Sequence, residues 1–216
     1  MDENPIEIKS GELTLEGRLS RPSAAGSTSI RGAVVCHPHP LYGGSMDNNV
    51  VGAIVRALSS DGIATLRFNF RGVGRSGGVH GGGVHGGGVE EMDDVRAAVA
   101  RLASEENIDA TVLAGYSFGA RMALGTAPTI SSIDTLIAVA PPISTPMGAP
   151  SLAGWNGRIL LIAGDRDAFC AVADLEKFHR EAGERSTIKI IAGADHFFGG
   201  FTDELERTIA KAIRPG

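Results

Sequence analysis

Residues 112–122 read VLAGYSFGARM, and this stretch decides how the rest of the chain is interpreted. An apolar run ends at Ser117, which has one glycine two positions before it and another two positions after it. Glycine inside a strand gives up side-chain packing and costs conformational entropy, so it usually marks a place where backbones approach closely. Two such positions around one hydroxyl group indicate that the fold displays this serine.

Short apolar runs alternate with amphipathic helical patterns on both sides of this stretch. The runs read GAVVC, IATLRFNF, ATVLAGYS, DTLIAVAPP, RILLIAGD and TIKIIAGAD, and helical patterns cover 47–62 and 90–104 and begin near residues 120, 171 and 202. This alternation predicts an α/β protein with a parallel sheet and helices on both faces. Before these runs, Ile6, Ile8, Leu13 and Leu15 alternate with polar residues around Gly11, which predicts an antiparallel hairpin.

Composition narrows the class of protein. The 216 residues are 43% hydrophobic and carry a net charge of -5, which favours one domain over 1–216 and argues against a nucleic-acid partner. Cys36 and Cys170 have neither a disulfide framework nor the paired spacing of a zinc or redox site. The N-terminus lacks the pattern of a signal peptide, and no apolar run reaches the roughly 18 residues that span a bilayer. We therefore expect a cytoplasmic protein without a membrane partner, and the sequence leaves a homodimer open.

Unusual residues follow five of the predicted strands. They are found in CHPHPLYGG (36–44), NFRGVGRSGG (69–78), GYSFG (115–119), GDRD (164–167) and GADHFF (193–198). In a parallel sheet of this kind, functional groups gather at the carboxyl ends of the strands. These segments are therefore expected to meet in space and form one site.

GYSFG fits the G-x-S-x-G pattern of a nucleophile elbow, in which a sharp turn joins a strand to a helix. A serine hydroxyl becomes a good nucleophile when a base removes its proton and a third group orients that base. In this pattern the acid follows the serine and the histidine comes last. Two histidines follow Ser117, and His179 lies in a charged helical pattern typical of a solvated surface, so we assign His196 as the base. Asp165 and Asp167 compete for the acid, and we prefer Asp167 because it extends further into the loop, while Asp165 would brace that loop.

The ordered pattern resembles the α/β-hydrolase superfamily from residue 32 to residue 213. CHPHPLYGGSMDN, NFRGVGRSGG and GADHFF resemble small bacterial serine hydrolases related to the dienelactone hydrolase-like and carboxylesterase families. The resemblance implies a three-layer α/β-hydrolase fold with a mostly parallel eight-stranded sheet, no cofactor, and a triad of Ser117, Asp167 and His196 as nucleophile, acid and base. Dienelactone hydrolases have cysteine at the elbow, so serine at this position favours ordinary esters as substrates.

An ester hydrolase also needs hydrogen-bond donors for the oxyanion of its tetrahedral intermediate. The amide of Phe118, the residue after the nucleophile, is the first expected donor. The second should come from the loop after the first buried strand, where Pro38 and Pro40 have no N–H group to donate. Superfamily members often carry His-Gly-x here with x donating, and this frame selects the amide of His39, with Leu41 as the alternative.

Histidines outside the predicted triad receive other roles. His37 and His39 are two residues apart, but no third ligand of clear spacing accompanies them, so we predict no metal site and a structural role for His37. Residues 77–89 read GGVHGGGVHGGGV, a duplication whose glycine content predicts a mobile surface loop. We assign its His80 and His85 no catalytic role. Arg71 is expected to brace loops.

The substrate site should be open. Only residues 143–157 separate two predicted strands where many lipases insert a helical cap, so no cap domain is expected. This favours a small-molecule partner, namely a short-chain carboxylic ester, cleaved through an acyl-enzyme. The residues expected to contact it are Leu41, Tyr42, Trp155, Phe169 and Phe197. Hydrolysis of thioesters, lactones or small peptides, and a non-catalytic binding role, remain the alternatives.

Overall fold

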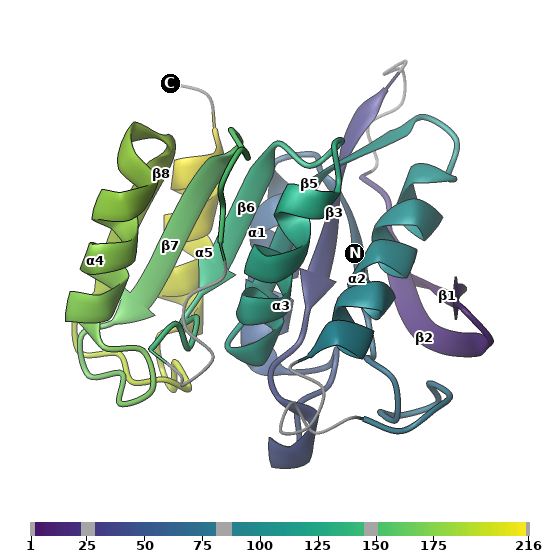
Figure 1. Ribbon diagram of the computed structural model, residues 1–216, viewed down its shortest axis with the longest axis horizontal. Coiled ribbons are helices and arrows are strands. Elements are labelled where there is room, and N and C mark those ends of the chain that lie inside the picture. The colour runs from purple at the N-terminus through teal and green to yellow at the C-terminus, as the bar shows by residue number, and fades with distance from the viewer. Residues whose placement is uncertain (1–2, 23–28, 81–87, 145–150, 215–216) are drawn as a thin grey trace.

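The computed structural model describes residues 3–22, 29–80, 88–144 and 151–214, which form a layered α/β structure (Figure 1). In this part of the chain, eight strands form one sheet with the order β1-β2-β4-β3-β5-β6-β7-β8. The strands are β1 (Glu3–Ser10), β2 (Leu13–Ser20), β3 (Ile30–Cys36), β4 (Ala64–Phe68), β5 (Ile108–Tyr116), β6 (Thr135–Val139), β7 (Arg158–Gly164) and β8 (Ser186–Ile191). Strands β4, β3 and β5 to β8 are parallel, and β1 and β2 are antiparallel additions at one edge.

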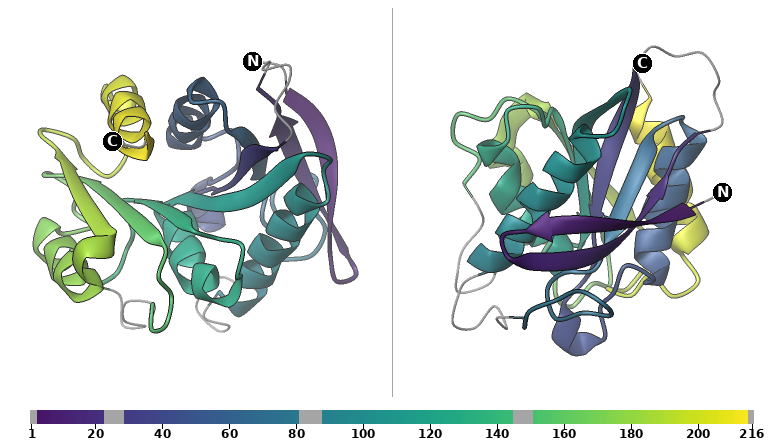
Figure 2. Two further views of the ribbon diagram at one scale, coloured as in Figure 1. Left: turned by 90° about the horizontal axis from the view of Figure 1, so that it is seen from above. Right: turned by 90° about the vertical axis from the view of Figure 1, so that its right-hand side faces the viewer.

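Helices cover both faces of this sheet. They are α1 (Asn49–Ser60), α2 (Val89–Ala103), α3 (Phe118–Thr126), α4 (Val172–Ala182) and α5 (Thr202–Ile213), with short 3₁₀ turns at Pro40–Tyr42, Ala127–Thr129 and Gly183–Arg185. Figure 2 shows α1 and α5 side by side on one face, and α2, α3 and α4 on the other. The expected three-layer α/β architecture is therefore confirmed.

The N-terminal hairpin has the expected alternation. Ile8 pairs with Leu15 across the two strands, and both side chains are fully buried, while the neighbouring Glu7 is exposed. The turn between β1 and β2 falls at Gly11, as the sequence predicts. Because β2 also pairs antiparallel with β4, the hairpin extends the parallel sheet rather than standing apart from it.

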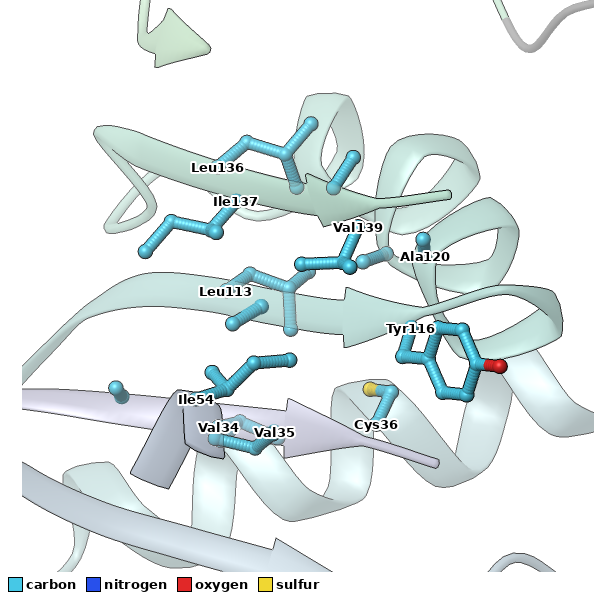
Figure 3. Packing of buried hydrophobic residues seen from close by; sticks show 14 of the residues in the cluster. Val34, Val35, Cys36, Ile54, Leu113, Tyr116, Ala120, Leu136, Ile137 and Val139 are labelled. Atoms are coloured by element: carbon cyan, nitrogen blue, oxygen red, sulfur yellow. The ribbon is translucent and has the colours of Figure 1, made fainter. Parts of the chain in front are cut away.

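The core lies between the sheet and its two helical layers. Val34, Leu113 and Leu136 occupy one row across β3, β5 and β6, and each is fully buried. Figure 3 shows these three residues within a cluster of buried residues that also includes Ile54 of α1 and Ala120 of α3, helices that lie on opposite faces of the sheet. Burying one such aliphatic side chain stabilises the fold by roughly 1.5–3 kcal/mol, which is why central strands covered on both faces are apolar throughout.

The parallel strands all end at the same edge of the sheet, the lower edge in Figure 1. The segment between β6 and β7, residues 140–157, is too short to hold a helical cap domain over this edge. None of the helices in the described ranges is both long and apolar enough to cross a membrane.

Candidate active site

Ser117 stands at the junction between β5 and α3, where the backbone turns sharply. Its φ is 52° and its ψ is -118°, a conformation that side-chain-bearing residues seldom adopt and that costs about 1–3 kcal/mol. The surrounding structure enforces it, because the Ser117 amide donates to the Val139 carbonyl oxygen (2.8 Å) and its carbonyl accepts from the Arg121 amide (3.0 Å). The serine hydroxyl is thereby displayed beyond the strand end.

The two glycines around Ser117 are required by close backbone contacts. A Cβ atom on Gly119 would lie within 3.0 Å of backbone atoms of Cys36 and His37, at the end of the neighbouring β3. A Cβ atom on Gly115 would lie equally close to the backbone of Gly119 and Ala120. Helix α3 can therefore begin directly against the strand ends only when both positions lack a side chain.

His196 links the serine to a carboxylate. Its Nε2 atom lies 3.0 Å from Ser117 Oγ, and its Nδ1 atom lies 3.0 and 2.9 Å from the two carboxylate oxygens of Asp167. Because an ionised carboxylate only accepts hydrogen bonds, Nδ1 carries the proton and Nε2 is left to accept from the hydroxyl. The structure thus brings together three side chains that the sequence separates by up to 79 positions.

Asp167, rather than Asp165, contacts the histidine. The Asp167 side chain is fully buried, and its Oδ1 atom accepts hydrogen bonds from the amides of Phe169 and Cys170, both at 2.8 Å. Asp165 instead accepts from the Gly193 amide (2.7 Å), so it braces the loop that carries His196. The buried carboxylate of Asp167 is therefore held in place by donors from its own loop and by the imidazole.

Neither cysteine takes part in this arrangement. Both Cys36 and Cys170 are buried and free. Burial raises the pKa of the Cys170 thiol to about 12, and burial likewise raises the pKa of Cys36. Both thiols therefore stay protonated at neutral pH and are poor nucleophiles.

In the described part of the chain, the amide of His39 in the loop after β3 has no protein acceptor. The amide of Leu41 donates to His39 Nδ1 (3.2 Å), those of Tyr42 and Gly44 donate to the His39 carbonyl oxygen, and that of Gly43 donates to Pro40. Within the described residues, no hydrogen bond occupies the amides of His39 and Phe118. The rings of these two residues pack with centroids 4.9 Å apart. The Leu41 amide, the alternative donor, is already engaged.

His37 holds this loop from beneath. It is fully buried; its Nδ1 lies 2.6 Å from the Pro38 carbonyl oxygen, and its Nε2 accepts from the Phe70 amide (3.1 Å). Burial lowers the pKa of His37 to about 4, because the charged imidazolium would lose its hydration. Nε2 also accepts the Phe70 amide hydrogen, which it does only while unprotonated. The imidazole therefore stays neutral and joins the loops after β3 and β4.

This histidine should make the protein sensitive to acid. The folded-state pKa of about 4 lies below the ordinary value of 6.5, so the unfolded chain binds more protons between these values. The contribution of neutral His37 to the free energy of unfolding is therefore present above about pH 6.5 and is lost as the pH falls toward 4. The expected loss between pH 7 and pH 5 is about 2 kcal/mol. Urea unfolding at both pH values should show this loss reduced in His37→Gln; an equal loss in the variant would contradict the assignment.

Arg71 braces the loops, as expected. Its guanidinium group donates to both carboxylate oxygens of Asp94 (3.0 and 2.7 Å), which also accept from the Arg71 amide and the Ser10 hydroxyl. Asp94 is fully buried in α2, so the network ties the loop after β4 to that helix and to β1.

His80 lies closer to the site than its glycine-rich surroundings indicate. Its ring centroid is 5.1 Å from that of His39 and 5.6 Å from that of Phe118. Its Nδ1 lies 2.8 Å from an oxygen of the buried Glu91, although the pair is not aligned for a hydrogen bond. His85 falls outside the described residues. Across the described ranges, no three His, Cys, Asp or Glu side chains are grouped to hold a metal ion.

Four of the five residues expected to contact substrate lie at the site and are exposed. Leu41 and Tyr42 form the turn beside His39, and the rings of Phe169 and Phe197 lie 4.9 and 5.6 Å from the ring of His196. The exposed fractions are 66% for Leu41, 88% for Tyr42, 61% for Phe169 and 63% for Phe197.

The expectation for Trp155 is wrong. Its side chain is buried, and its Nε1 donates to the Ile133 carbonyl oxygen (3.1 Å). Residues 133 and 155 precede β6 and β7, so this contact lies at the amino ends of the strands, opposite the site. The signal was present in the sequence, because Trp155 comes just before the apolar run RILLIAGD that predicts β7 and therefore belongs at the amino end of that strand.

Tyr116 is a residue whose contribution sequence reasoning missed. Strand β5 is separated in the sheet from β8 by β6 and β7, so the loop after β8 must cross back to bring His196 to Ser117. The Tyr116 hydroxyl donates to the His196 carbonyl oxygen (2.8 Å) and ties this loop to the elbow. Burial raises the pKa of Tyr116, so the hydroxyl keeps its proton. In Figure 3 the phenol ring lies at the carboxyl end of β5.

Tyr116→Phe is expected to lower kcat for a reaction at Ser117 by about three- to tenfold with little change in KM, because one hydrogen bond that positions His196 is lost while the ring remains. Steady-state kinetics and far-UV circular dichroism would measure this. An unchanged kcat, whether or not KM changes, would exclude a positioning role for Tyr116.

A serine displayed on a strand-to-helix elbow, in contact with a histidine and a buried carboxylate above a mostly parallel sheet, defines the class of α/β hydrolases. Residues 33–213 match the family model described as an alpha/beta hydrolase domain, and the chain belongs to this family.

Individual relatives agree with this assignment. An uncharacterised protein of Rickettsia prowazekii is 35% identical over 94% of this chain and 86% of its own length. An alpha-beta serine hydrolase homologue from Coxiella burnetii is 32% identical, with 99% of both chains covered and a TM-score of 0.86. A serine hydrolase without a lid from Xanthomonas campestris is 28% identical over 99% of this chain and 94% of its own, with a TM-score of 0.85.

Proposed function

We propose that this chain is a serine esterase that cleaves short-chain carboxylic esters through an acyl-enzyme. The observation that carries the proposal is the continuous relay from Ser117 Oγ to His196 Nε2 (3.0 Å) and from His196 Nδ1 to Asp167 (2.9 Å). The absence of space for a cap domain between β6 and β7 supports small esters that reach an open site.

Acylation would begin with attack of Ser117 Oγ on the ester carbonyl carbon. His196 Nε2 accepts the hydroxyl proton, and the Asp167 carboxylate stabilises the imidazolium that forms. The amides of Phe118 and His39 would donate to the oxyanion, and each such donor lowers the barrier by roughly 3–4 kcal/mol. As the intermediate collapses, the C–O bond to the alcohol breaks and His196 gives its proton to the leaving oxygen.

Deacylation would run through the same groups. A water molecule attacks the acyl carbon while His196 takes one of its protons, and the carboxylic acid leaves as the proton returns to Ser117 Oγ. The steps balance with the ester and one water molecule as reactants and the alcohol and the carboxylic acid as products. The buried, hydrogen-bonded Asp167 keeps the imidazole in one orientation throughout both halves of the cycle.

A fluorophosphonate probe tests the proposal directly. We expect stoichiometric labelling of Ser117, read by peptide mass spectrometry, and no labelling of urea-unfolded chain. Matched acetyl esters, thioesters, lactones and amides then separate the reaction types, with the oxygen ester expected to be the best substrate. A folded chain that the probe does not label at Ser117 would support a non-catalytic binding protein instead.

A further inference from the structure

Exposed apolar side chains gather at one end of the molecule. Six of the seven large hydrophobic residues that are exposed in the described part of the chain lie in segments that follow strand ends on the side of Ser117, and only Ile190 lies within a strand. The six are Leu41, Tyr42, Val79, Val89, Phe169 and Phe197. Exposed apolar side chains gathered at one edge of a molecule are typical of a binding site rather than of scattered surface residues.

Phe169 and Phe197 hold a particular place within this set, because they flank the histidine. Their ring centroids lie 4.9 and 5.6 Å from that of His196, and 6.5 Å from each other at an interplanar angle of 78°. Both backbones are anchored: the Phe169 amide donates to Asp167 (2.8 Å) and the Phe197 amide to Asp195 (3.0 Å). Two exposed rings are thus presented on fixed turns.

The chemistry of the proposed reaction decides which part of an ester these rings would meet. The acyl carbon becomes bonded to Ser117 Oγ, whereas the leaving oxygen must lie within hydrogen-bond reach of His196 Nε2 to take its proton. The alcohol portion therefore extends from His196 outward, past the two phenylalanine rings. The acyl portion lies toward Ser117.

We infer that the alcohol portion of the substrate is apolar and carries an aromatic ring, as in benzyl-type esters; the inference rests on the proposed esterase function. Two rings nearly perpendicular to each other can contact a third ring edge-to-face and offset at once, a geometry that aromatic groups favour. The Asp195 carboxylate beside Phe197 disfavours an anionic alcohol, since like charges repel.

The test compares acetates that share one acyl group: benzyl, cyclohexylmethyl, ethyl and choline acetates. In the native chain, kcat/KM for benzyl acetate should exceed that for ethyl acetate by about tenfold or more, with cyclohexylmethyl acetate between them. Phe169→Ala and Phe197→Ala should each reduce this ratio by about threefold or more, and Phe169→Leu by less. Ile190→Ala, on β8, is the matched control and should keep the native ratio.

Several outcomes would overturn the inference. They are a benzyl-to-ethyl ratio near one in the native chain, a ratio that both alanine variants retain, and a preference for choline acetate, which would indicate a cationic alcohol. If Ser117 reacts with the fluorophosphonate probe in these cases, only the choice of alcohol is wrong. If the probe does not label Ser117 and no acetate is cleaved, the esterase proposal fails together with it.

Discussion

Ser117→Ala is expected to lower kcat/KM for p-nitrophenyl acetate by about 10⁴–10⁶-fold, because the variant lacks the only atom that can form the acyl-enzyme. The fold should survive, since the hydrogen bonds that hold the elbow, from the Ser117 amide to Val139 and from the Arg121 amide to Ser117, are made by the backbone. Alanine also keeps the backbone strain at φ 52° unchanged. Steady-state kinetics and thermal unfolding of the purified variant would measure both effects.

Two further variants sharpen this result. His196→Ala should lose activity to a similar extent, and the double variant should lose little more, because residues of one relay do not contribute independently. Ser117→Gly should be inactive yet unfold at higher denaturant concentration than Ser117→Ala, since glycine adopts a positive φ without strain. A Ser117→Ala protein that still turned over the ester at near native rates would require another nucleophile.

Gly119→Ala should destabilise the fold by about 3 kcal/mol or more, or prevent folding at 37 °C. The new Cβ would meet backbone atoms of Cys36 and His37 at the end of β3, and backbone in a central strand cannot move aside as a flexible side chain can. If α3 shifted to relieve the clash, the Phe118 amide would move with it. Esterase activity should then fall even in the molecules that fold.

Gly52→Ala provides the matched control for this prediction. Gly52 also lies in a helix, α1, but its Cβ would meet only the far end of the Arg56 side chain, at 3.2 Å. Alanine is a better helix former than glycine, so this variant should be as stable as the native chain or more stable by up to about 1 kcal/mol. Equal destabilisation by both substitutions in urea unfolding would show that close backbone contact is not the cause at Gly119.

Much of the fold could be predicted from local patterns. Period-two alternation identified the hairpin at β1 and β2, and apolar runs that alternate with helical patterns identified the six parallel strands and the five helices. These signals are local, because burial on one face or on both faces sets the spacing of apolar residues along each segment. The resemblance to α/β hydrolases added the expectation of eight strands, which the structure confirms.

The candidate site was predictable in position but not in detail. Strand ends in a parallel sheet meet at one edge, so Ser117, Asp167 and His196 could be placed together from their order alone. The sequence could not tell which amide of the 39–44 loop remains without a protein acceptor, because that depends on the turn that Leu41 and Tyr42 make around His39. Trp155, by contrast, could have been placed, because it comes just before the run that forms β7 and so lies at the amino end of that strand, where its indole donates to Ile133.

The order of secondary-structure elements, and the residue types at each strand end, follow from the chain itself, since they depend on neighbours within a few positions. The distances that turn those residues into a relay depend on atoms from strands that are not adjacent. The Tyr116 hydroxyl draws the His196 loop back across β6 and β7, and the amides of Phe169 and Cys170 hold Asp167 against the imidazole. Such contacts arise only when the sheet is assembled, because no local pattern encodes a hydrogen bond between segments eighty positions apart.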